Sequence, residues 1–282
     1  MAARPPSRRK RTREPRAAGT SDLGARVLVA IPAIAFAIAI VVFGGLPFAA
    51  GLFVLGVMAM HELYSLMRRV RPVDIAGFLA LASLLLAALY GGRHQVLIVL
   101  VASLPFVFFV ALARSRRDDV SWAIAATMLG VVWIGLAFAH AVLLRELPHG
   151  GALVVDVLIG TFIGDTAAYF GGRIWGRRQL APSISPNKTV EGLVAGIVGG
   201  TVAFWGFAVA YQDWFAGPDA LLIGFCVAVA APVGDLFESL LKRDLEAKDT
   251  GRFFGAHGGV LDRLDAAFFT AVVGYYASIT VL

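Results

Sequence analysis

The chain has 282 residues, 59% of them hydrophobic, and its mean hydropathy is +0.78. Soluble domains are only about 45–50% apolar, so this composition excludes an ordinary soluble domain and indicates an integral membrane protein. The net charge is +6, and the single cysteine, Cys226, excludes an intrachain disulfide and a cysteine metal cage.

The N-terminal segment, residues 1–26, is rich in arginine and proline and nearly free of large apolar side chains. This composition predicts a disordered basic tail. The tail serves either as a topology signal or as a contact for anionic lipid headgroups, and the sequence leaves both interpretations open.

Apolar runs fill most of the remaining chain. A helix needs about 20 such residues to cross the hydrocarbon core of a membrane, and nine runs approach that length. They are residues 27–43, 46–66, 75–90, 96–113, 120–144, 152–170, 193–211, 221–241 and 266–282. No run shows the alternation of a strand, so the sequence predicts an all-α polytopic membrane protein with about nine transmembrane helices.

The basic residues predict the orientation of these helices. With nine crossings, every lysine and arginine except Arg93 and Arg145 falls on the side of the N-terminal tail. Because basic loops stay in the cytoplasm, the tail and the polar loops 171–192 and 242–265 are predicted to be cytoplasmic. We expect residues 27–150 to form a scaffold of about five helices and residues 151–282 to form the catalytic region.

The eighth run carries a row of polar residues. Asp235, Glu238, Ser239 and Lys242 are spaced at three, four and seven residues, which places them on one face of a helix. An acid inside a membrane span needs a cation, either a metal or a basic partner. A structural Asp–Lys pair is therefore the alternative to a metal site.

Two aspartates, Asp262 and Asp265, directly precede the ninth run. Carboxylates three residues apart on a helix repel each other unless a cation lies between them, and such oxygen ligands suit Mg²⁺. If Asp235 joins them from the neighbouring helix, the three acids are suited to a two-metal centre for phosphoryl displacement. The alternative is an acidic first turn that the helix dipole favours.

The two polar loops carry basic, hydroxyl and glycine residues. Lysines and arginines neutralise polyphosphates, and glycines let backbone amides approach a ligand. His257 is a candidate for a hydrogen bond to phosphate or for proton transfer, and Asp165, inside the sixth run, is a functional candidate as an intramembrane acid. A solvated loop and an amphipathic interfacial segment are the alternatives. His61, Glu62 and His140 follow no pattern.

Two segments carry a family resemblance. Residues 239–265, SLLKRDLEAKDTGRFFGAHGGVLDRLD, and residues 185–192, SPNKTVEG, resemble signatures of the phosphatidate cytidylyltransferases, also called CDP-diacylglycerol synthases. The resemblance implies transfer of a cytidylyl group from CTP to phosphatidate, with release of diphosphate. It also implies a Mg²⁺ centre on Asp235, Asp262 and Asp265, which a K⁺ ion can share.

The same resemblance implies the substrates and a homodimer, whereas the chemistry of the residues themselves supplies the remaining site candidates. The partners are CTP, phosphatidate and membrane lipids, with no nucleic acid, and a second copy of the chain in a homodimer. His257 joins the three aspartates as a catalytic residue, and Asp165 and Glu238 are further candidates. The substrate-binding residues by motif are Ser185, Lys188, Thr189, Ser239, Lys242, Arg243, Lys248, Asp249, Gly258, Gly259 and Arg263.

Two other functions remain open at this point. A CTP-dependent polyprenol kinase has the same need for metal and basic loops, but it releases CDP rather than diphosphate. An ion-coupled transporter would use Asp165, Asp235 and Glu238 as ion ligands along a path. The product formed from CTP separates the three functions.

Overall fold

A computed structural model describes residues 21–114, 118–247, 249–251 and 258–282, with the side chains of 21–30 and 33 left out. All nine predicted runs are helical. The helices are α1 (Ser21–Phe43), α2 (Gly45–Leu66), α3 (Asp74–Gly91), α4 (Arg93–Leu112), α5 (Val120–Gly130), α6 (Leu136–Arg145), α7 (Gly150–Trp175), α8 (Val190–Tyr211), α9 (Gly217–Asp244) and α10 (Leu261–Val281).

Short elements complete the fold. A 3₁₀ turn, η1 (Arg68–Val70), follows α2, and a π-helical turn, η2 (Val131–Gly135), joins α5 and α6 into one rod. Helix α1 begins at Ser21, inside the predicted 1–26 tail, and the tail before it lies outside the described residues.

Within the described chain, eight helical segments are long and apolar enough to cross a membrane, with α5, η2 and α6 counted as one. Helix α1 is not among these eight segments. Its apolar stretch found by the same criteria, Ile34–Phe43, is too short to be counted as a span. Large apolar side chains are exposed along the helix flanks, among them Phe43 and Phe109 at 76% and 65%. Such exposure suits contact with lipid and excludes a water-facing surface. The prediction of an all-α, multi-pass membrane protein is confirmed.

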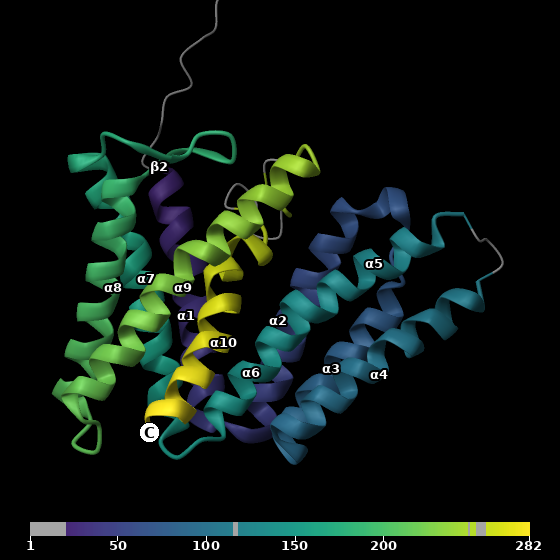
Figure 1. Cartoon of the computed structure of the whole chain (residues 1–282), viewed down its shortest axis with the longest axis horizontal. Helices are drawn as coiled ribbons and strands as arrows, with labels where there is room; N and C mark the ends of the chain where they lie inside the picture. Colours follow the sequence, from purple (N-terminus) through teal and green to yellow (C-terminus); the bar gives the residue numbers. More distant parts are fainter. Residues whose placement is uncertain (1–20, 115–117, 248, 252–257) are drawn as a thin grey trace, which may run out of the picture.

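The helices form two adjoining groups (Figure 1). Helices α1 and α7–α10 lie on one side and α2–α6 on the other, and α10 packs against α9, α7, α6 and α2. The start of α1, strand β2 (Ser185–Thr189) and the C-terminal end of α9 lie at one end of the bundle, whereas the C-terminus lies at the other. The start of α1 and the end of α10 therefore lie at opposite ends of the bundle.

Aromatic packing joins the two groups. The indole of Trp133 in η2 lies edge-on to the rings of Phe237 in α9 and Phe268 in α10, with centroids 4.8 and 5.8 Å apart. Phe138 in α6 contacts the same Phe268 at 5.2 Å. Such pairs contribute about 0.5–1.5 kcal/mol each beyond their buried area. Through them the N-terminal helices fix the positions of α9 and α10.

Glycines bring α7 and α8 together. Gly160 and Gly164 on α7 face Gly196 and Gly200 on α8, and a Cβ atom at Gly200 would lie 2.7 Å from the carbonyl oxygen of Gly160. Small residues at a four-residue spacing let membrane helices approach closely, where packing and weak polar contacts hold them. The close pairing of α7 and α8 thereby fixes both ends of the loop between them.

That loop contains a β-hairpin that the sequence did not predict. Strand β1 (Gln179–Ala181) pairs antiparallel with β2 (Ser185–Thr189), and Gln179 lies opposite Thr189. The hairpin is followed directly by α8, whose first turn Thr189 caps by accepting a hydrogen bond from the amide of Gly192 at 3.1 Å. The two strands are short and polar, so no alternation of apolar residues marks them.

Candidate functional site

Three carboxylates from two helices meet near the hairpin end of the bundle. Asp235 and Glu238 on α9 and Asp265 on α10 each offer one oxygen, and these oxygens lie within 4.8 Å of one another. We call these three residues the carboxylate cluster. The spacing of three residues puts the two α9 acids on one face, as predicted. The sequence named Asp235 and Asp265 as metal ligands and Glu238 only as a further candidate.

Gly234 explains why α10 comes so close to the cluster. A Cβ atom at this position would lie 2.5 Å from the carbonyl oxygen of Asp265 and 3.0 Å from the Cα atom of Ala266. The missing side chain therefore lets the α10 backbone pack directly against α9, which brings Asp265 to the α9 acids. Helix α9 itself runs unbroken from Gly217 to Asp244.

Two lysines pair with the acids. Lys188 from β2 forms an ion pair with Asp235. The ammonium of Lys242 lies 2.7 Å from a carboxylate oxygen of Glu238 and 3.1 Å from one of Asp262. Both lysines thus lie against the acids where the hairpin meets α9.

Glu238 is the most buried acid of the group. Its residue exposure is 1%, and its Oε1 atom has no hydrogen-bond partner among the described residues, although its Oε2 contacts Lys242. An unpartnered oxygen of a buried carboxylate is costly unless a cation or donor reaches it. This unpartnered oxygen is therefore a position in the described chain that a cation would stabilise.

Asp262 takes part in the same network in a different way. It accepts hydrogen bonds from the backbone amides of Gly259 at 2.7 Å and Thr250 at 3.1 Å, in addition to Lys242. Gly258 adopts a φ of +83°, which favours glycine, and a Cβ there would approach the Asp262 carboxylate to 2.6 Å. Asp262 thus fastens the start of α10, and its predicted role as a metal ligand stays a prediction.

Residues of the SPNKTVEG segment have two roles: some hold the hairpin in place, and Lys188 contacts the carboxylate cluster. Thr189 caps α8, and Glu191 accepts hydrogen bonds from the backbone amides of Arg177 at 3.0 Å and Arg178 at 3.2 Å. These contacts hold the hairpin, whereas Lys188 reaches the carboxylate cluster.

Arg243 ties the hairpin to α9. Its Nε donates to the carbonyl oxygen of Ile184 at 3.0 Å, which joins the turn of the hairpin to the last turn of α9. The loop and the helix that carry the site's lysines are therefore held together.

The other predicted substrate-binding residues lie around this network. Ser185 is half-buried on β2, and Ser239 is half-buried on α9. Asp249 is exposed in the loop before Thr250, and Arg263 is exposed on the first turn of α10. Lys248 and His257 lie outside the described residues.

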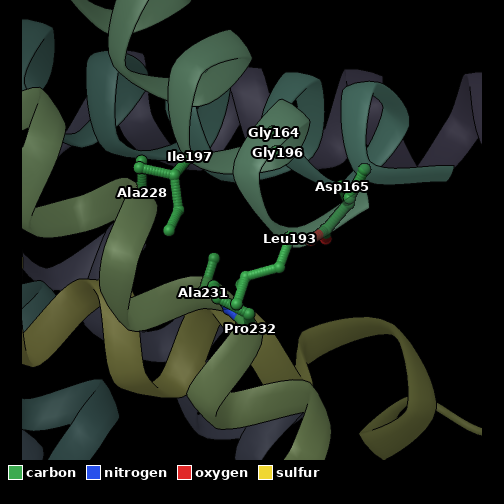
Figure 2. A pocket seen from close by; sticks show the side chains of 9 residues that line it. Gly164, Asp165, Leu193, Gly196, Ile197, Ala228, Ala231 and Pro232 are labelled. Atoms are coloured by element: carbon green, nitrogen blue, oxygen red, sulfur yellow. The ribbon is translucent and has the colours of Figure 1, made fainter. Parts of the chain in front are cut away.

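Asp165 stands at the rim of a small cavity between α7, α8 and α9. Figure 2 shows its side chain directed toward Leu193, with Ala231 and Pro232 across the cavity. The lining is otherwise apolar, and the volume of about 30 Å³ has room for about one water-sized group. Asp165 is near enough to Asp265, Asp235 and Lys188 for charge interaction, but the cavity is too small for an acyl chain.

Glu62 is a site neighbour that the sequence did not single out. Its carboxylate, on α2, accepts hydrogen bonds from the amides of Val260 at 3.0 Å and Leu261 at 2.9 Å. A lone acid near the end of an apolar run carries no motif, and its partners lie 198 and 199 residues further along the chain. Only the packing of α2 against α10 brings them together.

Comparison with known proteins identifies the family. The profile of the cytidylyltransferase family matches residues 24–281, nearly the whole chain. The chain belongs to the cytidylyltransferase family. Its two motifs therefore lie in an enzyme of this family, and the resemblance predicted from them is confirmed.

Curated relatives include several proteins named phosphatidate cytidylyltransferase. The one from Bacillus subtilis is 32% identical over 266 residues, which cover 90% of this chain and 97% of the relative. That from Staphylococcus haemolyticus is 29% identical, over 86% of this chain and 94% of the relative. That from Mycobacterium leprae is 35% identical over 154 residues, 54% of this chain and 48% of the relative.

Proposed function

We propose that this cytidylyltransferase transfers the cytidylyl group of CTP to phosphatidate, in the phospholipid synthesis of the cell membrane. A phosphate oxygen of phosphatidate attacks the α-phosphorus of CTP. The bond from that phosphorus to the β-phosphate oxygen breaks, so the products are CDP-diacylglycerol and diphosphate. The observation that carries the proposal is the carboxylate cluster, bordered by Lys188 and Lys242, in a chain of this family.

The cluster fits a divalent cation of the Mg²⁺ type. Its donors are all carboxylate oxygens, which Mg²⁺ prefers, and the unpartnered Oε1 of Glu238 adds an acceptor that the described protein groups leave unused. Asp235, Glu238 and Asp265 would hold the ion. Such an ion neutralises phosphate charge and favours in-line displacement. The role of Asp262 as a metal ligand, the second metal ion and the K⁺ ion stay predictions.

The basic residues bring two polyanions together. We assign Lys188, Lys242 and Arg243 to the phosphates of the substrates, since all three lie where the hairpin meets α9. Phosphatidate carries its own anionic nucleophile, so the reaction needs no serine or cysteine. Positioning and charge neutralisation are what the protein has to supply. Roles for His257, Lys248, Asp249 and the signature glycines stay predictions.

We place the site at the cytoplasmic face. The carboxylate cluster lies toward the bundle end that carries the hairpin and the start of α1, and the basic residues of the chain gather in the loops of that side. CTP is available in the cytoplasm, and phosphatidate reaches the same interface from the bilayer. The homodimer stays a prediction, as does the division of the chain at residue 150 into a scaffold and a catalytic region.

Product analysis tests the proposal. Purified full-length protein is incubated with α-³²P-labelled CTP, phosphatidate and Mg²⁺, and lipid and water-soluble products are separated. Label in a CDP-lipid together with diphosphate release supports cytidylyl transfer. Release of labelled CDP would favour the kinase, and ion flux without consumption of CTP would favour the transporter.

A further inference from the structure

Glu62 joins the N-terminal helices to the site. Its side chain is buried, with 8% residue exposure, and its two oxygens each accept a backbone amide at the start of α10. Oε1 accepts from Val260 and Oε2 from Leu261, while the hydroxyl of Thr250 also lies 3.4 Å from Oε2. The first amides of a helix have no partner within the helix, so this carboxylate satisfies two of them.

The charge of Glu62 suits that place. A negative group at a helix N-terminus is stabilised by the helix dipole, and hydrogen bonds to a carboxylate are stronger than neutral ones. Asp262 follows Leu261 directly, and Asp265 follows one turn later. The carboxylate of Glu62 therefore fixes the turn of α10 that presents both aspartates.

Two glycines of the signature segment fit around the same side chain. A Cβ atom at Gly251 or at Gly259 would overlap the carboxylate of Glu62. Neither glycine has a positive φ, so backbone conformation does not require them. Their common feature is contact with Glu62, which explains why larger residues do not fit at either position.

We propose that Glu62 is a positioning residue of the cytidylyl-transfer site, acting through α10 on Asp265 and Asp262. The inference rests on the proposed function and extends it to a helix that the sequence assigned to the scaffold. Glu62 does not touch the carboxylate cluster directly; it holds the first turn of α10, and the Gly251 and Gly259 backbones close around it.

The first test is Glu62→Gln, which keeps the shape but replaces one acceptor oxygen by an NH₂ group facing an amide. We expect kcat to fall about 10–100-fold and the Mg²⁺ concentration for half-activation to rise, as for residues that orient metal ligands. The KM for phosphatidate should stay unchanged. The matched control is Glu146→Gln, the same change at an exposed residue at the end of α6, which should behave like wild type.

The second test is a double-mutant cycle with Gly259→Ala. In the wild-type background the added methyl group overlaps the Glu62 carboxylate and should lower kcat. In a Glu62→Ala background the obstacle is gone, so the same change should cost much less. If Glu62→Gln does not fold, the single change Gly259→Ala still probes the contact from the loop side, because it leaves Glu62 in place.

The outcomes separate this inference from the proposed function. Wild-type protein without turnover would refute the function, and Mn²⁺ affinity measured by electron paramagnetic resonance on the same preparations would still report positioning. Active wild type with unchanged kcat and metal affinity in Glu62→Gln would overturn the positioning role. Equal effects of Gly259→Ala in both backgrounds would overturn it as well.

Discussion

Replacing Gly234 by alanine tests whether close contact of α9 and α10 builds the site. Ordinary Cβ contacts begin at about 3.4 Å, whereas a Cβ at Gly234 would lie 2.5 Å from the carbonyl oxygen of Asp265. The α10 backbone must therefore shift by about 0.9 Å. A misplacement of about 1 Å in a catalytic group can lower the rate about 100-fold, and we expect a loss of that size in kcat.

Stability changes less than activity in this variant. Overpacking costs about 1–3 kcal/mol, while alanine gains up to about 1 kcal/mol over glycine in a helix interior. The net expected destabilisation is about 0–2 kcal/mol.

The assay is CDP-diacylglycerol formation by purified protein in detergent, together with thermal unfolding. Gly206→Ala on α8 is the matched control, because a Cβ there meets nothing within 4 Å. We expect that variant to keep wild-type activity and stability. Full activity in Gly234→Ala would refute the claim that the helix contact positions Asp265.

Three further predictions concern charges and caps. Asp265→Asn should abolish turnover while the folded protein remains in the membrane, as measured by product formation and gel filtration; near-wild-type activity would contradict its role in the cluster. Lys242→Met should destabilise the protein by about 3–5 kcal/mol, because it leaves Glu238 buried without its ion pair. Adding Glu238→Gln to the same chain should restore much of the lost stability. A double variant that is as unstable as Lys242→Met alone would contradict this reasoning. Thr189→Ala should lower stability by about 1 kcal/mol by removing the α8 cap, and an unchanged unfolding temperature would argue against the cap.

The sequence predicted the helices well because the membrane imposes a length and a composition on each span. All nine runs are helical, and α5, η2 and α6 form the single rod predicted for residues 120–144. The β1–β2 hairpin escaped prediction because its strands are short and polar. Helix periodicity is also enough to place Asp235 and Glu238 on one face, because residues three apart are neighbours on a helix surface.

The sequence could not predict contacts between residues that lie far apart in the chain. The spacing of Asp262 and Asp265 could not show that Asp262 accepts hydrogen bonds from the backbone amides of Gly259 and Thr250, and its role as a metal ligand stays a prediction. These contacts depend on the turn at Gly258, which local spacing does not reveal. The contacts of Glu62 likewise depend on the packing of α2 against the start of α10, which no local pattern encodes.

The central claim is that Asp235, Glu238 and Asp265 together bind a divalent cation. Its most direct test is Mn²⁺ binding to the purified protein by electron paramagnetic resonance, for wild type and for Asp235→Asn, Glu238→Gln and Asp265→Asn. We expect saturable binding in the wild type, displaced by Mg²⁺ and strongly weakened in each variant. Wild-type affinity in all three variants would contradict it.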